Sequence, residues 1–139
     1  MRAVPRHQSI PVPAQIEATE LVARSALGLI WLYLGLFPKL LWQVPEEVAI
    51  VERTGLFVVS PAWTITAVGV LEIACGIWLL TGWQARAAVV FVTALMLAMM
   101  LTVIPVEPSL LLGPFGGLVK NLALLACAWI VWMLAGKRS

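Results

Sequence analysis

The chain has 139 residues, of which 62% are hydrophobic and only 12% are charged. A soluble domain is about 25% charged, so this chain lacks the polar side chains that would cover a surface in water. Its formal net charge of +2 is too small and too scattered for a phosphate-binding face. The composition excludes a disordered chain, a nucleic-acid binder and an ordinary cytosolic enzyme, and it predicts one membrane-embedded domain.

Four apolar runs are long enough for a spanning helix, which needs about 20 residues. They cover residues 21–42, 62–83, 87–106 and 118–136. The runs lack the apolar–polar alternation of a membrane barrel, so helices are predicted. The fold class is therefore all-α integral membrane, with a four-helix transmembrane domain over residues 21–136.

The segments outside these runs are short. Residues 1–20 contain three prolines and are predicted to form a flexible tail rather than a cleaved signal peptide. Residues 45–57 mix four charges with apolar side chains, which indicates a short amphipathic segment at the membrane interface. Residues 106–117 are apolar but broken by proline and glycine, as expected of a re-entrant or surface loop.

Four spans place both termini on the same side of the membrane. Six basic residues fall on that side, and they are Arg2, Arg6, Arg24, Arg86, Lys137 and Arg138. Three fall on the other side, and they are Lys39, Arg53 and Lys120. By the positive-inside rule, both termini are predicted to be cytoplasmic.

Isolated polar residues within the spans form one predicted layer. With a rise of about 1.5 Å per residue, Lys39 lies about 22 Å above Arg24 on the first helix, and Glu72 lies about 21 Å above Arg86 on the second. Measured in the same way from Lys137, Asn121 and Lys120 lie about 24 and 26 Å up the fourth helix. Three helices therefore bring polar groups to one depth, in the outer half of the bilayer.

Glycines indicate which way these groups face. Gly28 and Gly35 share a helical stripe with Lys39, and Gly69 and Gly76 share one with Glu72. Glycine stripes in membrane helices commonly mark close helix contacts.

A carboxylate in hydrocarbon also needs a partner. We therefore expect a Lys39–Glu72 pair that holds Glu72 ionised, with Lys120 and Asn121 as further partners. Two interpretations stay open: the cluster staples the helices, with lysines reaching the headgroups, or it binds a ligand and handles protons.

Other chemistry has little support in the sequence. Cys75 and Cys127 lie at similar depth but form no C-x-x-C motif, and thiols in the middle of a bilayer are usually inert. Three methionines at positions 96, 99 and 100 indicate packing rather than a soft-metal site. The single histidine, His7, lies in the tail. We therefore predict no metal site and assign no catalytic residue.

Three motifs carry a family resemblance. They are G-L-F-P-K at residues 35–39, G-V-L-E-I-A-C-G-I-W-L-L-T-G-W-x-x-R at 69–86, and G-P-F-G-G-L-V-K-N at 113–121. With these motifs the chain resembles the DoxX-like family of small bacterial four-helix membrane proteins over about residues 20–136. That family includes DoxD-type subunits of thiosulfate:quinone oxidoreductase. The resemblance implies a bacterial cytoplasmic membrane location and an association with redox systems. The chain lacks the paired cysteines of the thiol-redox relatives.

The leading hypothesis is a membrane subunit that binds a quinone or anchors a partner oxidoreductase. In it Glu72 accepts a proton or hydrogen bond, Lys39 and Lys120 stabilise negative charge, and Asn121 orients the ligand. Arg24 and Arg86 would anchor the inner face. One alternative is a non-catalytic scaffold that recruits other proteins or forms a homo-oligomer. Another is a small-solute carrier, which ranks last because the inner half of the bundle offers almost no polar path.

The predicted topology can be tested with reporter fusions. Reporters at either terminus should report the cytoplasm, and a reporter inserted next to Arg53 should report the outer compartment, because basic residues accumulate on the cytoplasmic side. A C-terminal fusion that reports the outer compartment would contradict the arrangement of four spans.

Overall fold

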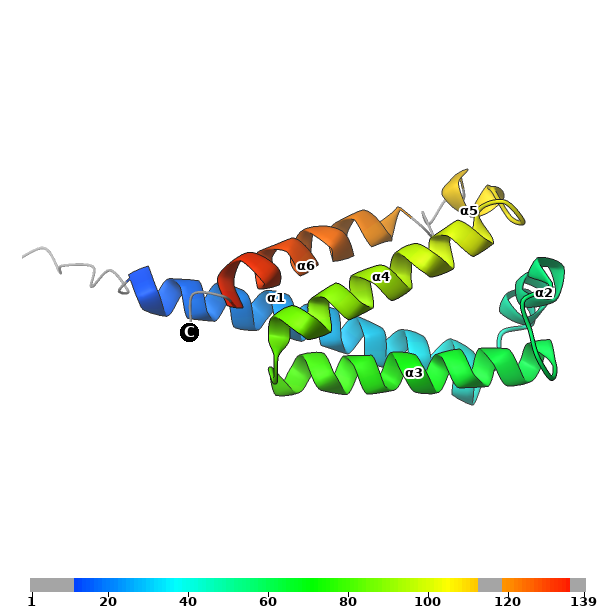
Figure 1. Ribbon diagram of the computed structural model, residues 1–139, viewed down its shortest axis with the longest axis horizontal. Helices are drawn as coiled ribbons and strands as arrows, with labels where there is room; N and C mark the ends of the chain where they lie inside the picture. The colour runs from blue at the N-terminus through cyan, green and yellow to red at the C-terminus, as the bar shows by residue number, and fades with distance from the viewer. Residues whose placement is uncertain (1–11, 113–118, 136–139) are drawn as a thin grey trace, which may run out of the picture.

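The computed structural model describes residues 12–112 and 119–135, and all regular structure in these ranges is helical. The elements, in chain order, are α1 (Val12–Gly35), η1 (Leu36–Leu41, a π-helix), α2 (Pro45–Thr54), α3 (Pro61–Thr81), α4 (Ala85–Val103), α5 (Ser109–Leu112) and α6 (Lys120–Ala135). α1 and α3 lie side by side, α4 and α6 lie across from them, and α2 covers one end (Figure 1).

Local sequence explains where the long helices begin and end. α3 starts with Pro61 in its first turn, directly after Ser60, whose side chain accepts a hydrogen bond from the backbone N–H of Trp63. Proline and a serine N-cap are the residues that favour a helix start. α3 ends at Gly82, whose φ of +71° is a left-handed conformation that glycine adopts without strain.

Three of the predicted spans are confirmed as apolar helices long enough to cross a membrane: Pro13–Leu41, Pro61–Thr81 and Ala85–Val103. The fourth, Lys120–Ala135, is apolar but has 16 described residues. That is about 24 Å of helix, against a hydrocarbon core of about 30 Å. The fourth span therefore stays a prediction, as does the side of the membrane that each terminus faces.

Two segments outside the spans differ in detail from what the sequence suggested. Where residues 1–20 were expected to form a flexible tail, the chain is helical from Val12, and the first turns of α1 project beyond the other helices (Figure 1). Within the loop expected at residues 106–117, a short helix forms over Ser109–Leu112. The basic residues at positions 2, 6, 137 and 138 and the glycines after Leu112 lie outside the described residues.

Glycines bring α1 and α3 into backbone contact, as their stripes predicted. A Cβ atom on Gly76 would lie 2.8 Å from the carbonyl oxygen of Gly28, and one on Gly35 would lie 2.5 Å from the carbonyl oxygen of Gly69. Both distances are far too short for a carbon atom against backbone. The two helices can therefore pack this closely only because all four positions lack a side chain.

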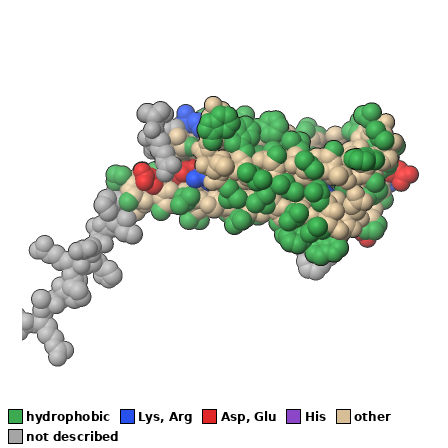
Figure 2. Space-filling model, turned by 90° about the horizontal axis from the view of Figure 1, so that it is seen from below, with side chains coloured by type: hydrophobic (Ala, Val, Ile, Leu, Met, Phe, Trp, Pro, Cys, Tyr) green, Lys and Arg blue, Asp and Glu red, His purple; other side chains and the backbone are tan. Residues whose placement is uncertain are grey.

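The outer surface suits a bilayer. Hydrophobic side chains spread along the flank of the bundle, and charged groups gather near its two ends (Figure 2). Large apolar residues such as Leu29, Leu101 and Leu122 are more than half exposed, while the four largest fully buried side chains come one from each long helix. These four are Leu27, Leu79, Val92 and Val131. An apolar flank of this extent is typical of a surface that lies against lipid.

The α1–α3 contact can be tested by filling it. Gly76→Leu should destabilise the protein by about 1–3 kcal/mol, the usual cost of overpacking, because the new side chain meets the backbone of α1. Thermal unfolding of the purified protein in detergent measures the change. Ala74→Leu, two residues earlier on the exposed face of α3, is the matched control and should be nearly neutral. Equal effects of the two changes would argue against the glycine contact.

Candidate functional site

A cavity of about 360 Å³ lies among the helices at the end that α2 covers. All the long helices, together with η1, α2 and α5, contribute to its wall, which is mostly apolar. The polar side chains that line it are Lys39, Glu47, Thr54, Thr64, Glu72, Thr102, Lys120 and Asn121. All four residues of the predicted polar layer therefore line one cavity.

A proline positions Lys39. Pro38 has no backbone N–H, so it cannot donate to the carbonyl oxygen of Leu34, the acceptor that an α-helix would assign to it. The chain forms a π-helix here, and the Lys39 Nζ atom donates to that carbonyl at 3.3 Å. π-helical turns occur frequently at functional sites. The G-L-F-P-K motif thus turns the lysine inward, where it is 9% exposed.

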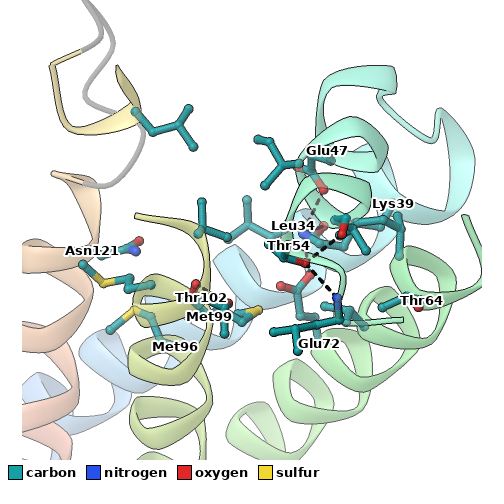
Figure 3. A pocket seen from close by; sticks show the side chains of 18 of the residues that line it. Leu34, Lys39, Glu47, Thr54, Thr64, Glu72, Met96, Met99, Thr102 and Asn121 are labelled. Carbon is teal, nitrogen blue, oxygen red and sulfur yellow. Dashed lines mark hydrogen bonds and ion pairs between the residues drawn. The ribbon is translucent and has the colours of Figure 1, made fainter. Parts of the chain in front are cut away.

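The predicted Lys39–Glu72 pair is present. Nζ of Lys39 lies 3.0 Å from Oε2 of Glu72, whose side chain is 3% exposed. Apart from this ammonium, the oxygen has no polar partner among the described residues. A second carboxylate, Glu47 on α2, lies 3.5 Å from the same Nζ. Lys39 is therefore held between one buried and one half-exposed carboxylate (Figure 3).

Lys120 and Asn121 line the cavity but do not join this ion pair, which differs from the expectation. Asn121 is 9% exposed and lies on α6, away from Glu72 and on the side of the methionines (Figure 3). Its side chain makes no hydrogen bond within the described ranges. Lys120 is exposed and makes no ion pair with any described residue. The residues predicted at one depth therefore line one cavity, but Lys120 and Asn121 do not contact the Lys39–Glu72 pair.

Methionines form much of the wall contributed by α4. Met96, Met99 and Met100, for which the sequence indicated packing, all line the cavity, and Met96 is also part of the buried core. A methionine side chain is flexible and polarisable, so it adapts to ligands of different shape. The three therefore combine a packing role with a place in the cavity wall.

Ion pairs hold α2 in place at both of its ends, and the sequence did not predict them. Glu47, near its start, contacts Lys39. Arg53, near its end, contacts Glu107 in the connection after α4, at 2.7 Å. Hydrogen bonds from the Ser109 hydroxyl and from Arg53 hold the pKa of Glu107 below its usual range. This carboxylate therefore stays ionised, and its share of stability is lost only as the pH falls through that lowered pKa.

At the other end of the bundle, two arginines join helices. Arg24 is buried and donates from Nη1 to the carbonyl oxygens of Leu79 and Leu80, at 2.7 and 2.8 Å. These oxygens lie in the last turn of α3, where carbonyls lack helical partners and a cation is favoured. Arg86 donates to the carbonyl oxygen of Trp132 near the end of α6 and stacks over its ring.

The described residues contain no group of three or more metal-ligating His, Cys, Asp or Glu side chains. Cys75 and Cys127 are both free, and Cys75 is fully packed in the core.

The contribution of the buried Lys39–Glu72 pair to stability can be measured by removing one or both charges. Lys39→Met leaves Glu72 buried beside no cation, which should cost about 3–5 kcal/mol of stability. The double variant Lys39→Met/Glu72→Met removes both charges and should recover much of that loss, since an apolar replacement of a buried pair is often neutral. Thermal unfolding in detergent reports both. Glu47→Gln, at the half-exposed carboxylate, is the control and should change the stability only slightly. A double variant that is less stable than Lys39→Met would contradict the pairing.

Comparison with known proteins identifies the family. A family model described as the DoxX-like family matches residues 28–129, well over half of the chain, and this range includes both halves of the ion pair. No curated protein matches the chain, and no solved structure does. The match agrees with the resemblance carried by the three sequence motifs. The chain belongs to the DoxX-like family.

Proposed function

We propose that this protein is a membrane subunit that binds a small lipid-soluble molecule of the quinone class in the cavity beneath α2. The observation that carries the proposal is a cavity of about 360 Å³, mostly apolar, with a buried Lys39–Glu72 pair in its wall. Small-molecule sites have this character: about 300–1,000 Å³, with apolar walls and a few placed polar groups.

The charges of the cavity favour an uncharged ligand. Lys39 and Lys120 supply two positive charges, and Glu47 and Glu72 supply two negative charges, so the lining residues balance one another. A charged ligand would leave an unmatched charge in a medium where burying an ion is costly. A neutral ring with polar substituents, carried on an apolar tail, fits both the balance and the apolar wall.

The balance of positive and negative charges in the cavity also changes the role proposed for Lys39. The sequence favoured Lys39 as a group that stabilises negative charge on a ligand. In the structure its ammonium already has three protein acceptors within 3.5 Å, namely Leu34 O, Glu47 Oε2 and Glu72 Oε2. We therefore propose that Lys39 holds Glu72 in place and ionised, and that Glu72 and Asn121 contact the ligand.

In this proposal the electrons come from or go to a separate partner oxidoreductase in the same membrane. Membership of the DoxX-like family, which includes DoxD-type subunits of thiosulfate:quinone oxidoreductase, supports this role. The interior between the cavity and the arginine end is packed with apolar side chains such as Leu27, Leu79 and Val131. That packing argues against the carrier alternative, which needs a continuous polar path.

Occupancy of the cavity can be tested with one pair of matched variants. Val68 lines the cavity, and Val70, two residues later on α3, is 54% exposed on the lipid face. A short-chain benzoquinone, offered in its oxidised and its reduced form, should stabilise the wild-type protein and the Val70→Phe variant. At a concentration 100 times its Kd, the probe should raise the free energy of unfolding by about 2.7 kcal/mol. Val68→Phe fills the cavity and should abolish the gain.

Thermal unfolding in detergent measures these shifts, and mass spectrometry of the protein purified in mild detergent identifies what it carries. A gain that survives in Val68→Phe would place binding elsewhere. Purification with a fixed soluble protein and no stabilisation by either form of the probe would favour the scaffold alternative instead.

A further inference from the structure

The hydrogen-bonding groups of the cavity are unevenly distributed. Near Glu72 the donors are already used. The Lys39 ammonium carries three N–H donors and has three protein acceptors within reach, as described above. The hydroxyls of Thr54 and Thr64 donate to carbonyl oxygens of their own helices or caps, Val51 at 2.7 Å and Ser60 at 3.1 Å.

Glu72 is short of donors. An ionised carboxylate has about four acceptor positions, and within the described part of the chain Lys39 is the only polar group paired with it. Its Oε2 atom, which faces Lys39, is completely buried, so the position open to a ligand is on Oε1, which accepts no hydrogen bond from any described residue. A buried carboxylate with so few donors is costly. A further donor can reach this carboxylate from the cavity that the side chain lines.

The opposite side of the cavity, on α1 and α6, differs because its polar side chains have no hydrogen-bond partner among the described residues. Asn121 on α6 is nine-tenths buried, lines the cavity, and hydrogen-bonds to no described residue (Figure 3). Its amide can both donate and accept. Trp31 on α1 lines the cavity as well, and its indole N–H likewise has no acceptor in the described ranges. Free donors therefore lie on the α1 and α6 side, and the unfilled acceptor lies on α3.

We infer that the cavity selects a ligand by a hydroxyl group: a neutral amphiphile that donates an O–H to Glu72 and offers a second oxygen to Asn121 on the opposite side, such as the reduced, hydroquinone form of a quinone; a phenol makes the first of these contacts alone. This inference rests on the proposed function, because it concerns the same cavity. A fully oxidised quinone offers acceptors alone, so it can meet Asn121 but leaves Glu72 without a donor. The cavity then favours the reduced member of a quinone pair.

A matched pair of ligands tests the hydroxyl requirement: a 4-alkylphenol and its methyl ether, with the same ring and tail. The ether cannot donate, and it is the more apolar of the two. If apolar burial alone governed binding, the ether would bind at least as well. We expect the phenol to bind about ten- to hundredfold more tightly, the range for a hydrogen bond to a charged group. Ligand-dependent thermal unfolding of the wild-type protein in detergent gives both affinities.

Glu72→Gln supplies the second arm. A glutamine amide donates as well as accepts, so this variant should bind the ether nearly as well as the phenol. Asn121→Ala should leave the ratio of the two affinities unchanged. Both variants keep Glu47 beside Lys39, so the cation stays paired.

The possible failures are distinguishable. Equal affinities of phenol and ether in the wild-type protein would overturn the inference while leaving the cavity as a binding site. A preference for the phenol that persists in Glu72→Gln would also overturn it, since the donor would then be recognised elsewhere. If neither ligand binds, and the benzoquinone probe does not bind in either form, the proposed function itself fails and water alone supplies the donor to Glu72.

Discussion

The close contact of α1 with α3 is the constraint on which the rest of the structure depends. At each charged residue of the buried pair, a glycine lies opposite on the partner helix. A Cβ atom on Gly69 would lie 2.9 Å from the Cβ of Lys39, and one on Gly35 would lie 3.0 Å from the Cβ of Glu72. The glycines therefore make the room in which a lysine and a glutamate can face each other inside the bundle. A larger residue at either position would separate the helices and leave two charges apart in an apolar medium, where each is costly.

The sequence was sufficient to predict this contact, because everything it depends on is local to two helices. Helical spacing predicts that Gly28, Gly35 and Lys39 share one side of the first span, and the same holds for the stripe on α3 that carries Glu72. Depth along each helix follows from the rise per residue. The prediction needed only two helices that pack through their glycines, and the structure contains that contact, with a π-helical segment around Lys39 that helical spacing alone did not predict.

The remainder of the site could not be predicted in the same way. Glu47 reaches Lys39 because the chain reverses at Gln43, which adopts a φ of +40°, and lays α2 over the end of the bundle. Nothing in the local sequence specifies that rare conformation for a glutamine. Asn121 lines the same cavity as Glu72, but a predicted depth does not determine whether two side chains touch or face each other across a cavity. The same limit applies to Arg53 and Glu107, which are brought together only by the position of α2.

The cavity exists because the bundle is not packed equally on all sides. α1 and α3 meet through glycines, whereas α3 and α4 are joined by a tight turn near Gly82 and diverge from it toward the end that α2 covers (Figure 1). α4 contains no glycine, and its side of the cavity is lined by flexible methionines instead. The two sides of the cavity therefore differ in rigidity as well as in polarity. The ion pair on the α1–α3 side is fixed by backbone contact, so in the proposed function it would recognise one chemical group in one position. The methionine side is flexible, so it can accommodate different apolar tails on a ligand that carries that group. A binding site for membrane-dissolved molecules requires this combination of selectivity for the polar head and tolerance of the apolar tail.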